Sequence, residues 1–302
     1  MRVAAPVLDL RTIPEPAEPT LEHDPNEETQ LLYGEQVLVH EQQGEWVRVE
    51  AIEQPEWTHN QQWEGYPGWV TRDGLVADDP QWQPNLVVTD AVALVHTRPH
   101  EDQTAFLKLS LGTRLMAVAN DDGWLQIHLL NGQDGWINED QAEYLSDLEQ
   151  LSLAERREQI IASAQRLVGT PYYWGGRSAR IHGYRRPPNT AVDCSGLVNL
   201  CYRAAGVDIP RDAHEQLLRA RAIPLADAQR GDLIFLADPE DREQITHVML
   251  YLGDGRVIEG PGTGERVRQT DLGQKFGQDW EALASAGQTP TGRRITAGTY
   301  FP

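Results

Sequence analysis

The sequence predicts an α+β protein built from several modules along its 302 residues. Three observations carry this prediction. The length exceeds that of a typical single domain and suits two or three. Short alternating strand patterns fill residues 30–144 and occur in two copies. From residue 151 the pattern changes to an amphipathic helix, followed by alternating helix and strand.

The first modules are β-rich. Residues 1–25 are rich in proline and glutamate, and we expect an extended arm. Residues 26–80 and 81–148 each place a Gly-Trp pair in the last strand, at Gly68-Trp69-Val70 and Gly135-Trp136-Ile137. This signature resembles the bacterial SH3-type domain, which implies two small SH3-like β-barrels. We expect their tryptophans to fill the barrel cores.

Composition excludes several classes of function. Hydrophobic residues make up 40% and charged residues 24%, as in ordinary globular proteins. The net charge of −20 repels nucleic acid and anionic membrane surfaces, so neither is an expected partner. No apolar run is long enough to span a bilayer, and the first residues lack a signal-peptide core. We therefore expect a cytoplasmic protein, with export as the alternative if a leader has been removed.

The two cysteines, Cys194 and Cys201, lie seven residues apart in one predicted helix, about 10 Å along its axis. That separation is too long for a disulfide. Free thiols fit a reducing compartment, and two cysteines exclude a disulfide framework or a cysteine-only zinc site. No metal or cofactor is expected.

Residues 149–302 form the predicted third domain, which is α+β. Within it, Asp193 is a natural N-cap, so Cys194 falls in the first turn of a helix that ends before Gly206. The helix dipole there favours a thiolate, which predicts a lowered cysteine pKa and a reactive nucleophile. Cys201 is expected to be an inert core residue.

A base and an orienting group follow on two strands. His247 opens a strand and shares a face with Met249 and Tyr251. A two-residue turn at Asp254-Gly255 would place Glu259 on the wrong face, whereas a three-residue loop would pair Met249 with Glu259. The second register leaves Glu259 diagonal to His247 and within reach of it. The alternative is a solvated glutamate on an edge strand.

Residues 150–302 resemble the NlpC/p60 family of papain-like cell-wall cysteine peptidases. With two SH3-type domains in front, the whole chain resembles the γ-D-glutamyl-L-diamino acid endopeptidases that recycle cell-wall peptides. The motifs that carry the resemblance occur in the family's order: Gly169-Thr170-Pro171-Tyr172, Trp174-Gly175-Gly176, Asp193-Cys194-Ser195-Gly196-Leu197, Gly231-Asp232-Leu233, His247-Val248 and Tyr251-Leu252-Gly253.

The resemblance implies roles for single residues. The catalytic positions fall on Cys194 as nucleophile, His247 as base and Glu259 as the third polar residue, where the family usually has His, Asn or Gln. The substrate-binding positions fall on Glu35, Tyr66, Trp174, Ser195 and Asp212. Three of these, Asp212, Glu35 and Tyr66, are expected to bind a free L-alanyl amine.

The segment 178–190 is longer than usual for the family and is a candidate pocket wall. A pocket for a free amine needs acidic groups, because a buried ammonium without partners is costly. The leading hypothesis is therefore hydrolysis of the γ-D-glutamyl to diaminopimelate or lysine bond in murein peptides with a free N-terminal L-Ala. The alternatives are a non-catalytic module that binds cell-wall peptide, and an amidase or acyltransferase on the same scaffold.

Overall fold

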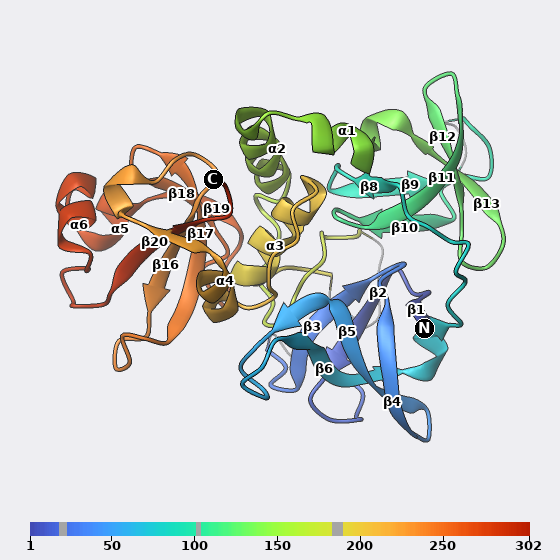
Figure 1. The fold of residues 1–302 in the computed structure, drawn as a ribbon, viewed down its shortest axis with the longest axis horizontal. Helices are drawn as coiled ribbons and strands as arrows, with labels where there is room; N and C mark the ends of the chain where they lie inside the picture. Colours follow the sequence, from blue (N-terminus) through green and yellow to red (C-terminus); the bar gives the residue numbers. More distant parts are fainter. Residues whose placement is uncertain (18–22, 101–103, 183–189) are drawn as a thin grey trace.

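The computed structural model describes residues 1–17, 23–100, 104–182 and 190–302. Figure 1 shows two β regions, coloured blue and green, and a third region of helices and a large sheet, coloured yellow to red. Helices α2 (Leu153–Arg166), α3 (Cys194–Ala204) and α4 (Ala213–Arg219) lie between the two β regions and the large sheet, whereas α5 (Leu272–Phe276) and α6 (Trp280–Ala286) lie on the far side of that sheet (Figure 1). The α+β prediction is confirmed.

The first β region contains a five-stranded antiparallel sheet with the order β3-β2-β6-β5-β4. Its strands are β2 (Val7–Arg11), β3 (Glu27–Leu32), β4 (Val37–Gln43), β5 (Trp46–Glu56) and β6 (Glu64–Thr71). A separate pair joins β1 (Arg2–Val3) to β7 (Leu75–Val76). Strands β3 and β4 are the two edges of this sheet. It is therefore an open sheet and not the predicted barrel.

The prediction of an extended arm at residues 1–25 is wrong for its first half. Strands β1 and β2 belong to the first β region, and β2 pairs with both β3 and β6. The reason is burial: Leu10 is fully buried in the core, and Arg11 makes ion pairs with Asp24 and Glu27 at 2.9 and 3.2 Å. Five residues are enough for a strand when both faces are covered.

The second β region repeats this plan. Its sheet has the order β13-β12-β11-β8-β14, and β9 pairs with β10 beside it. The strands are β8 (Leu86–Val88), β9 (Val92–Val95), β10 (Leu107–Ser110), β11 (Arg114–Asp121), β12 (Trp124–His128), β13 (Asp134–Asn138) and β14 (Ala142–Tyr144). A 3₁₀ turn follows the Gly-Trp strand in both copies, at Arg72–Gly74 and Glu139–Gln141.

The tryptophans of the Gly-Trp pairs do not fill the cores as predicted. Trp69 and Trp136 are only partly buried, whereas the next residues, Val70 and Ile137, are fully buried. Because side chains alternate along a strand, the residue after each tryptophan faces the core.

The third region has six antiparallel strands in the order β15-β20-β16-β17-β18-β19. They are β15 (Arg221–Ile223), β16 (Leu233–Ala237), β17 (Ile245–Gly253), β18 (Arg256–Glu259), β19 (Arg268–Asp271) and β20 (Ile295–Thr299). The helices are α1 (Leu145–Gln150), α2 (Leu153–Arg166), α3 (Cys194–Ala204), α4 (Ala213–Arg219), α5 (Leu272–Phe276) and α6 (Trp280–Ala286), with a 3₁₀ turn at Leu225–Asp227.

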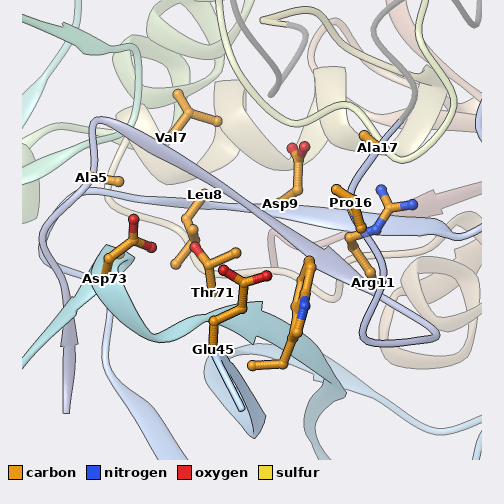
Figure 2. A pocket seen from close by; sticks show the side chains of 12 residues that line it. Ala5, Val7, Leu8, Asp9, Arg11, Pro16, Ala17, Glu45, Thr71 and Asp73 are labelled. Atoms are coloured by element: carbon orange, nitrogen blue, oxygen red, sulfur yellow. The ribbon is translucent and has the colours of Figure 1, made fainter. Parts of the chain in front are cut away.

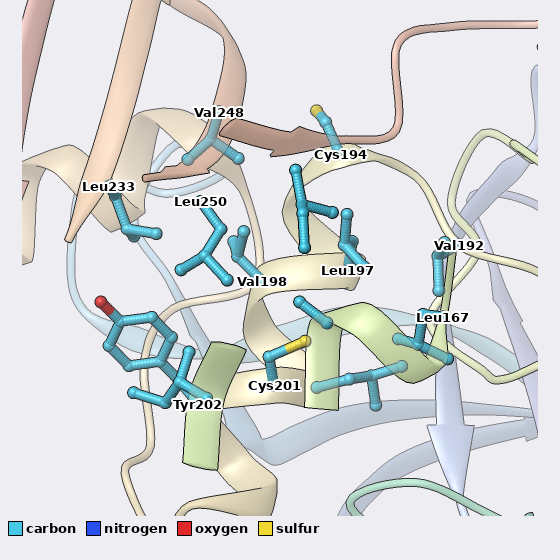
Figure 3. Close-up of a cluster of buried hydrophobic side chains, with 14 of the residues drawn as sticks. Leu167, Val192, Cys194, Leu197, Val198, Cys201, Tyr202, Leu233, Val248 and Leu250 are labelled. Carbon is cyan, nitrogen blue, oxygen red and sulfur yellow. The ribbon is translucent and has the colours of Figure 1, made fainter. Parts of the chain in front are cut away.

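Helix α3 is the centre of the largest core, and every one of its residues is buried. It packs against α2 and β17. Figure 3 shows the side chain of Cys201 among the core residues, while Cys194 lies at the start of the helix, at the edge of the same cluster. The predicted inert position of Cys201 agrees with its complete burial.

Buried arginines of the third region form hydrogen bonds and ion pairs with both β regions. Arg203 of α3 donates from Nε to the carbonyl of Gly112 at 2.9 Å and pairs with Glu53 of β5. Arg177 pairs with Glu35 at 2.9 Å. Among the described residues, no helix has the length and apolar character needed to cross a membrane.

We expect Asp9→Asn to stabilise the protein at pH 8. Burial raises the pKa of Asp9 to about 6, above its unfolded value, so stability is lost as the pH rises through 6 and the carboxylate ionises. Asparagine keeps the acceptor for the Gln30 amide, which lies at 3.1 Å. The melting temperature of the variant should therefore exceed that of the wild-type protein at pH 8, and the difference should be smaller at pH 5. Equal gains at both pH values in calorimetry would contradict this explanation.

Candidate active site

A cavity of about 470 Å³ lies where the first β region meets helices α3 and α4. Its lining includes Cys194 of α3 and a group of polar residues from the first β region. Its walls are formed by Glu28, Thr58, His59, Tyr66, Tyr172, Trp174, Asp193, Cys194, Ser195, Asp212, Ala213, His214, Glu215, Gln244, Ile245 and Thr246.

Asp193 fixes the start of the nucleophile helix. Its Oδ1 accepts the N–H of Gly196 at 2.6 Å, which is the predicted N-cap. Its Oδ2 accepts the N–H of Gly175 at 3.1 Å and a hydrogen bond from Arg211 at 2.8 Å. Gly175 has a φ of +74° and packs on the backbone of Glu27, so a side chain there would collide. These bonds hold Cys194 at the cavity wall.

The thiol of Cys194 is a neutral group at rest, which corrects the prediction of a lowered pKa. Burial raises the pKa of Cys194 to about 12, and the nearby charge of Asp193 adds to the rise. The backbone N–H groups of Val248 and Ser195 oppose this rise in the pKa. Within the described residues no hydrogen bond joins the thiol to His247, although His247 is the neighbour of Val248. The proton must therefore move to the base during the reaction.

His247 and Glu259 do meet. Nε2 of His247 lies 2.9 Å from Oε2 of Glu259, whose side chain is fully buried. Because Glu259 occupies Nε2, the other ring nitrogen, Nδ1, remains to accept a proton. Burial lowers the pKa of His247, so the imidazole is neutral at pH 7 and can act as a base.

The β17–β18 hairpin sets the position of Glu259 relative to His247. It has the two-residue turn of one predicted alternative and the strand register of the other. The turn has two residues, Asp254 and Gly255, both with positive φ, and closes the pair Gly253 with Arg256. A bulge between Tyr251 and Gly253 then shifts the register, so Leu250 pairs with Ile258. The bulge therefore places Glu259 on the same face of the sheet as His247, as the three-residue loop was expected to do.

The polar end of the cavity is built around Tyr66. Its hydroxyl lies 2.8 Å from Oδ2 of Asp212 and 3.0 Å from Oε2 of Glu28. Burial raises the pKa of Tyr66 well above its usual value, so the phenol keeps its proton. Burial also raises the pKa of Asp212 to about 7, although its side chain is 39% exposed toward the cavity. The structure thus brings Tyr66 and Asp212 together as predicted.

Glu35 is not part of this cavity, and its predicted position is wrong. It is 2% exposed and its carboxylate pairs with Arg177 at 2.9 Å and with Arg203 at 3.6 Å. Gln54 also donates to it at 3.0 Å. Glu35 therefore neutralises buried arginines between the regions. Glu28, on β3, provides the acidic group that sequence reasoning assigned to Glu35.

Trp174 and Ser195 both line the cavity, as predicted. Trp174 is 49% exposed, and its ring lies 5.5 Å from that of His23. Ser195 is held by Arg211, which donates to its hydroxyl at 2.8 Å. Most of the segment proposed as a pocket wall, residues 183–189, lies outside the described residues, and Ala179 at its start instead contacts Ser110 of the second β region.

Sequence reasoning missed further groups at the site. Tyr172 lines the cavity, and burial raises its pKa, so the phenol keeps its proton and is a hydrogen-bond donor near Cys194. His59 packs edge-on against the ring of Tyr66 at 5.3 Å and bonds to Glu56 at 3.0 Å. Tyr172 was visible in the quoted motif. No local pattern distinguishes Glu28 or His59, because their roles depend on contacts between distant segments.

A second cavity of about 410 Å³ lies in the first β region, beside Asp9, Arg11 and Trp46 (Figure 2). Its lining residues include no cysteine or histidine, so it lacks a thiol nucleophile and an imidazole base. Within the part of the chain that the structure describes, no cluster of His, Cys, Asp and Glu could hold a metal ion. Nucleophilic chemistry therefore points to the cavity at Cys194.

Comparison with known proteins decides the family. Residues 169–285 match the model of the NlpC/P60 family. Two γ-D-glutamyl-L-lysine dipeptidyl-peptidases are similar over most of the chain. The protein from Bacillus cereus is 31% identical over 78% of this chain and 67% of its own length. The one from Bacillus subtilis is 33% identical over 80% and 74%. The chain belongs to the NlpC/P60 family.

The family resemblance and the prediction of a cysteine peptidase are both confirmed. The whole fold is shared as well. The crystal structure of an NlpC/P60 family protein from Bacillus cereus ATCC 10987 superposes with a TM-score of 0.79 at 25% identity, covering 100% of this chain and 99% of the other. The likeness therefore extends through both β regions and is not limited to the matched residues.

Proposed function

We propose that this NlpC/P60 peptidase hydrolyses the bond between γ-D-glutamate and a diamino acid in murein peptides whose N-terminal L-Ala is free. Two relatives named as γ-D-glutamyl-L-lysine dipeptidyl-peptidases support this substrate class. The observation that carries the proposal is the acidic end of the Cys194 cavity, formed by Glu28, Tyr66 and Asp212.

The acidic end suits an ammonium group. The single hydroxyl proton of Tyr66 lies between two carboxyl groups and can satisfy only one of them. The free cavity therefore has more acceptors than donors. A primary ammonium brings three N–H donors and a positive charge. Its charge also favours ionisation of Asp212, whose pKa is about 7 in the empty cavity.

The residues around Cys194 suit acyl transfer. The Cys194 sulfur attacks the γ-glutamyl carbonyl carbon as its proton passes to His247, and the C–N bond then breaks as His247 protonates the leaving amine. Water, deprotonated by His247, releases the dipeptide and regenerates the thiol. Backbone N–H groups at the start of α3 and the Tyr172 hydroxyl are the donors available to the oxyanion.

We also propose that the enzyme acts on released peptides in the cytoplasm. The acidic groups Glu28 and Asp212 favour a charged free amine over an uncharged, glycan-linked acyl group on the alanine nitrogen. The two cysteines are free and buried, which fits a reducing compartment. The net charge of −20 disfavours docking on anionic wall polymer.

The test is turnover of L-Ala-γ-D-Glu-L-Lys beside its α-linked isomer, followed by release of new primary amine. We expect cleavage of the γ-linked peptide and little cleavage of the α-linked one, because the α linkage moves the carbonyl away from Cys194 when the amine is bound. Binding of the γ-linked peptide without cleavage would instead favour the non-catalytic binding module.

A further inference from the structure

The carboxylate of Glu259 lies among several cationic and hydrogen-bonding groups. Oε2 accepts from His247 and forms an ion pair with Lys275 of α5. Oε1 accepts from the hydroxyl of Thr270 at 3.0 Å and lies 3.5 Å from Arg268 of β19. The Glu259 side chain is fully buried, Lys275 is 22% exposed and Arg268 is 48% exposed. Lys275 is thus the least solvated cation that contacts Glu259.

A glutamate at this position has an electrostatic cost. A buried carboxylate against imidazole favours the protonated ring, and imidazolium cannot take a proton from the Cys194 thiol. A neutral orienting group would not have this effect. The thiol of Cys194 is itself neutral at rest, so the reaction depends on a neutral His247.

We infer that Lys275 is a positioning residue for catalysis: it holds the Glu259 carboxylate against His247 and cancels its charge, which keeps the imidazole neutral. This inference rests on the proposed catalytic role of His247, but not on the identity of the peptide substrate. Lys275 and His247 both contact Oε2 of Glu259, so the ammonium acts directly on the oxygen that accepts the hydrogen bond from His247.

Other charged groups around His247 do not replace Lys275. Arg293, before β20, also lowers the pKa of His247 through its charge, but it donates to the hydroxyl of Thr246 at 3.2 Å and to the carbonyl of Ala237 at 2.9 Å, and within the described residues it makes no ion pair with Glu259. Arg268 is half exposed and also pairs with Glu265 at 2.7 Å. On α3, the thiol of Cys194 is uncharged and the carboxylate of Asp193 is paired with Arg211. Strand β16 places an apolar residue, Leu236, opposite His247.

The pKa values agree with this arrangement. Burial lowers the pKa of His247, the hydrogen bond to Glu259 opposes that change, and the charge of Lys275 lowers it again. For Glu259, burial alone would raise the pKa, but the bonds to His247 and Lys275 bring it down to about 2. The carboxylate therefore stays ionised, and removal of Lys275 would leave its charge uncompensated beside the imidazole.

The test is a histidine titration by NMR of the full chain, with the His247 signal assigned from the His247→Gln variant. We expect Lys275→Met to raise the pKa of His247 by roughly one unit, a tenfold change in proton affinity. The acid limb of kcat/KM should move upward by the same amount, with little change in KM. Lys108→Met, on β10 of the second β region, is the matched control, because among the described residues its ammonium donates to the exposed carbonyl of His182 and has no recorded contact with Glu259 or His247.

A double variant separates charge compensation from structural support. Lys275→Met with Glu259→Gln removes both charges and should return the pKa of His247 toward the wild-type value. If Lys275 only supports the fold, both single and double variants should lower the melting temperature and leave the His247 pKa unchanged, which would overturn the inference. The titration needs no substrate, so a wild-type enzyme that fails to cut the tripeptide would refute the proposed function alone.

Discussion

Cys194→Ala is expected to abolish peptide hydrolysis while leaving the fold intact. The substitution removes the only thiol among the described residues that line the cavity. The side chain is small and lies at the start of α3, so little core volume is lost. The kcat should fall by several orders of magnitude, since the nucleophile and its base act as one unit.

Cys201→Ala is the matched control for this variant. Cys201 is fully buried in the core around α3 (Figure 3) and is not one of the residues that line the cavity. The change should lower the melting temperature slightly through a small cavity and retain most of the kcat. Loss of activity in Cys201→Ala with activity retained in Cys194→Ala would contradict the assignment of the nucleophile.

N-acetylation of the substrate is expected to lower kcat/KM by tenfold or more. Acetylation removes the positive charge that Glu28 and Asp212 would bind and adds bulk beside the hydroxyl of Tyr66. A hydrogen bond to a charged group is worth about 1.5 to 3 kcal/mol, and about 1.4 kcal/mol corresponds to a factor of ten. The measurement is kcat/KM for the free and the acetylated tripeptide.

Two glutamate variants of the protein test the proposed pocket for the substrate amine. Glu28→Gln should raise KM for the free peptide and narrow the difference between free and acetylated substrates. Glu35→Gln should leave KM nearly unchanged and reduce stability, because Glu35 compensates Arg177 and Arg203 between the regions. A larger KM effect from Glu35 than from Glu28 would restore the sequence-based assignment.

The positions of the proposed catalytic residues could be predicted because their signals are local. Asp193 and Cys194 mark a helix start within two residues, and His247 opens an apolar strand. Glu259 required only the register of one hairpin. Even there, the turn alone would have given the wrong face, and the bulge at Leu252 decides the outcome. A bulge leaves little trace in a sequence without glycine at the bulged position.

The rest depends on contacts between distant segments. Glu28 and Glu35 are seven residues apart, and only the packing of the first β region on α4 decides which of them reaches Asp212. Lys275 meets Glu259 only because α5 folds back over β18 and β19. Burial likewise reversed the expected pKa of Cys194, since the desolvation of a charged thiolate outweighs the helix dipole.

The most direct test of the account is mass spectrometry of the products that the wild-type protein forms from L-Ala-γ-D-Glu-L-Lys in H₂¹⁸O. The account predicts free lysine and the dipeptide L-Ala-γ-D-Glu with ¹⁸O in its γ-carboxyl group, because water releases the acyl group from Cys194. Release of free alanine would show that a different bond is cut, and would contradict the assignment of Glu28, Tyr66 and Asp212 as the pocket for the substrate amine.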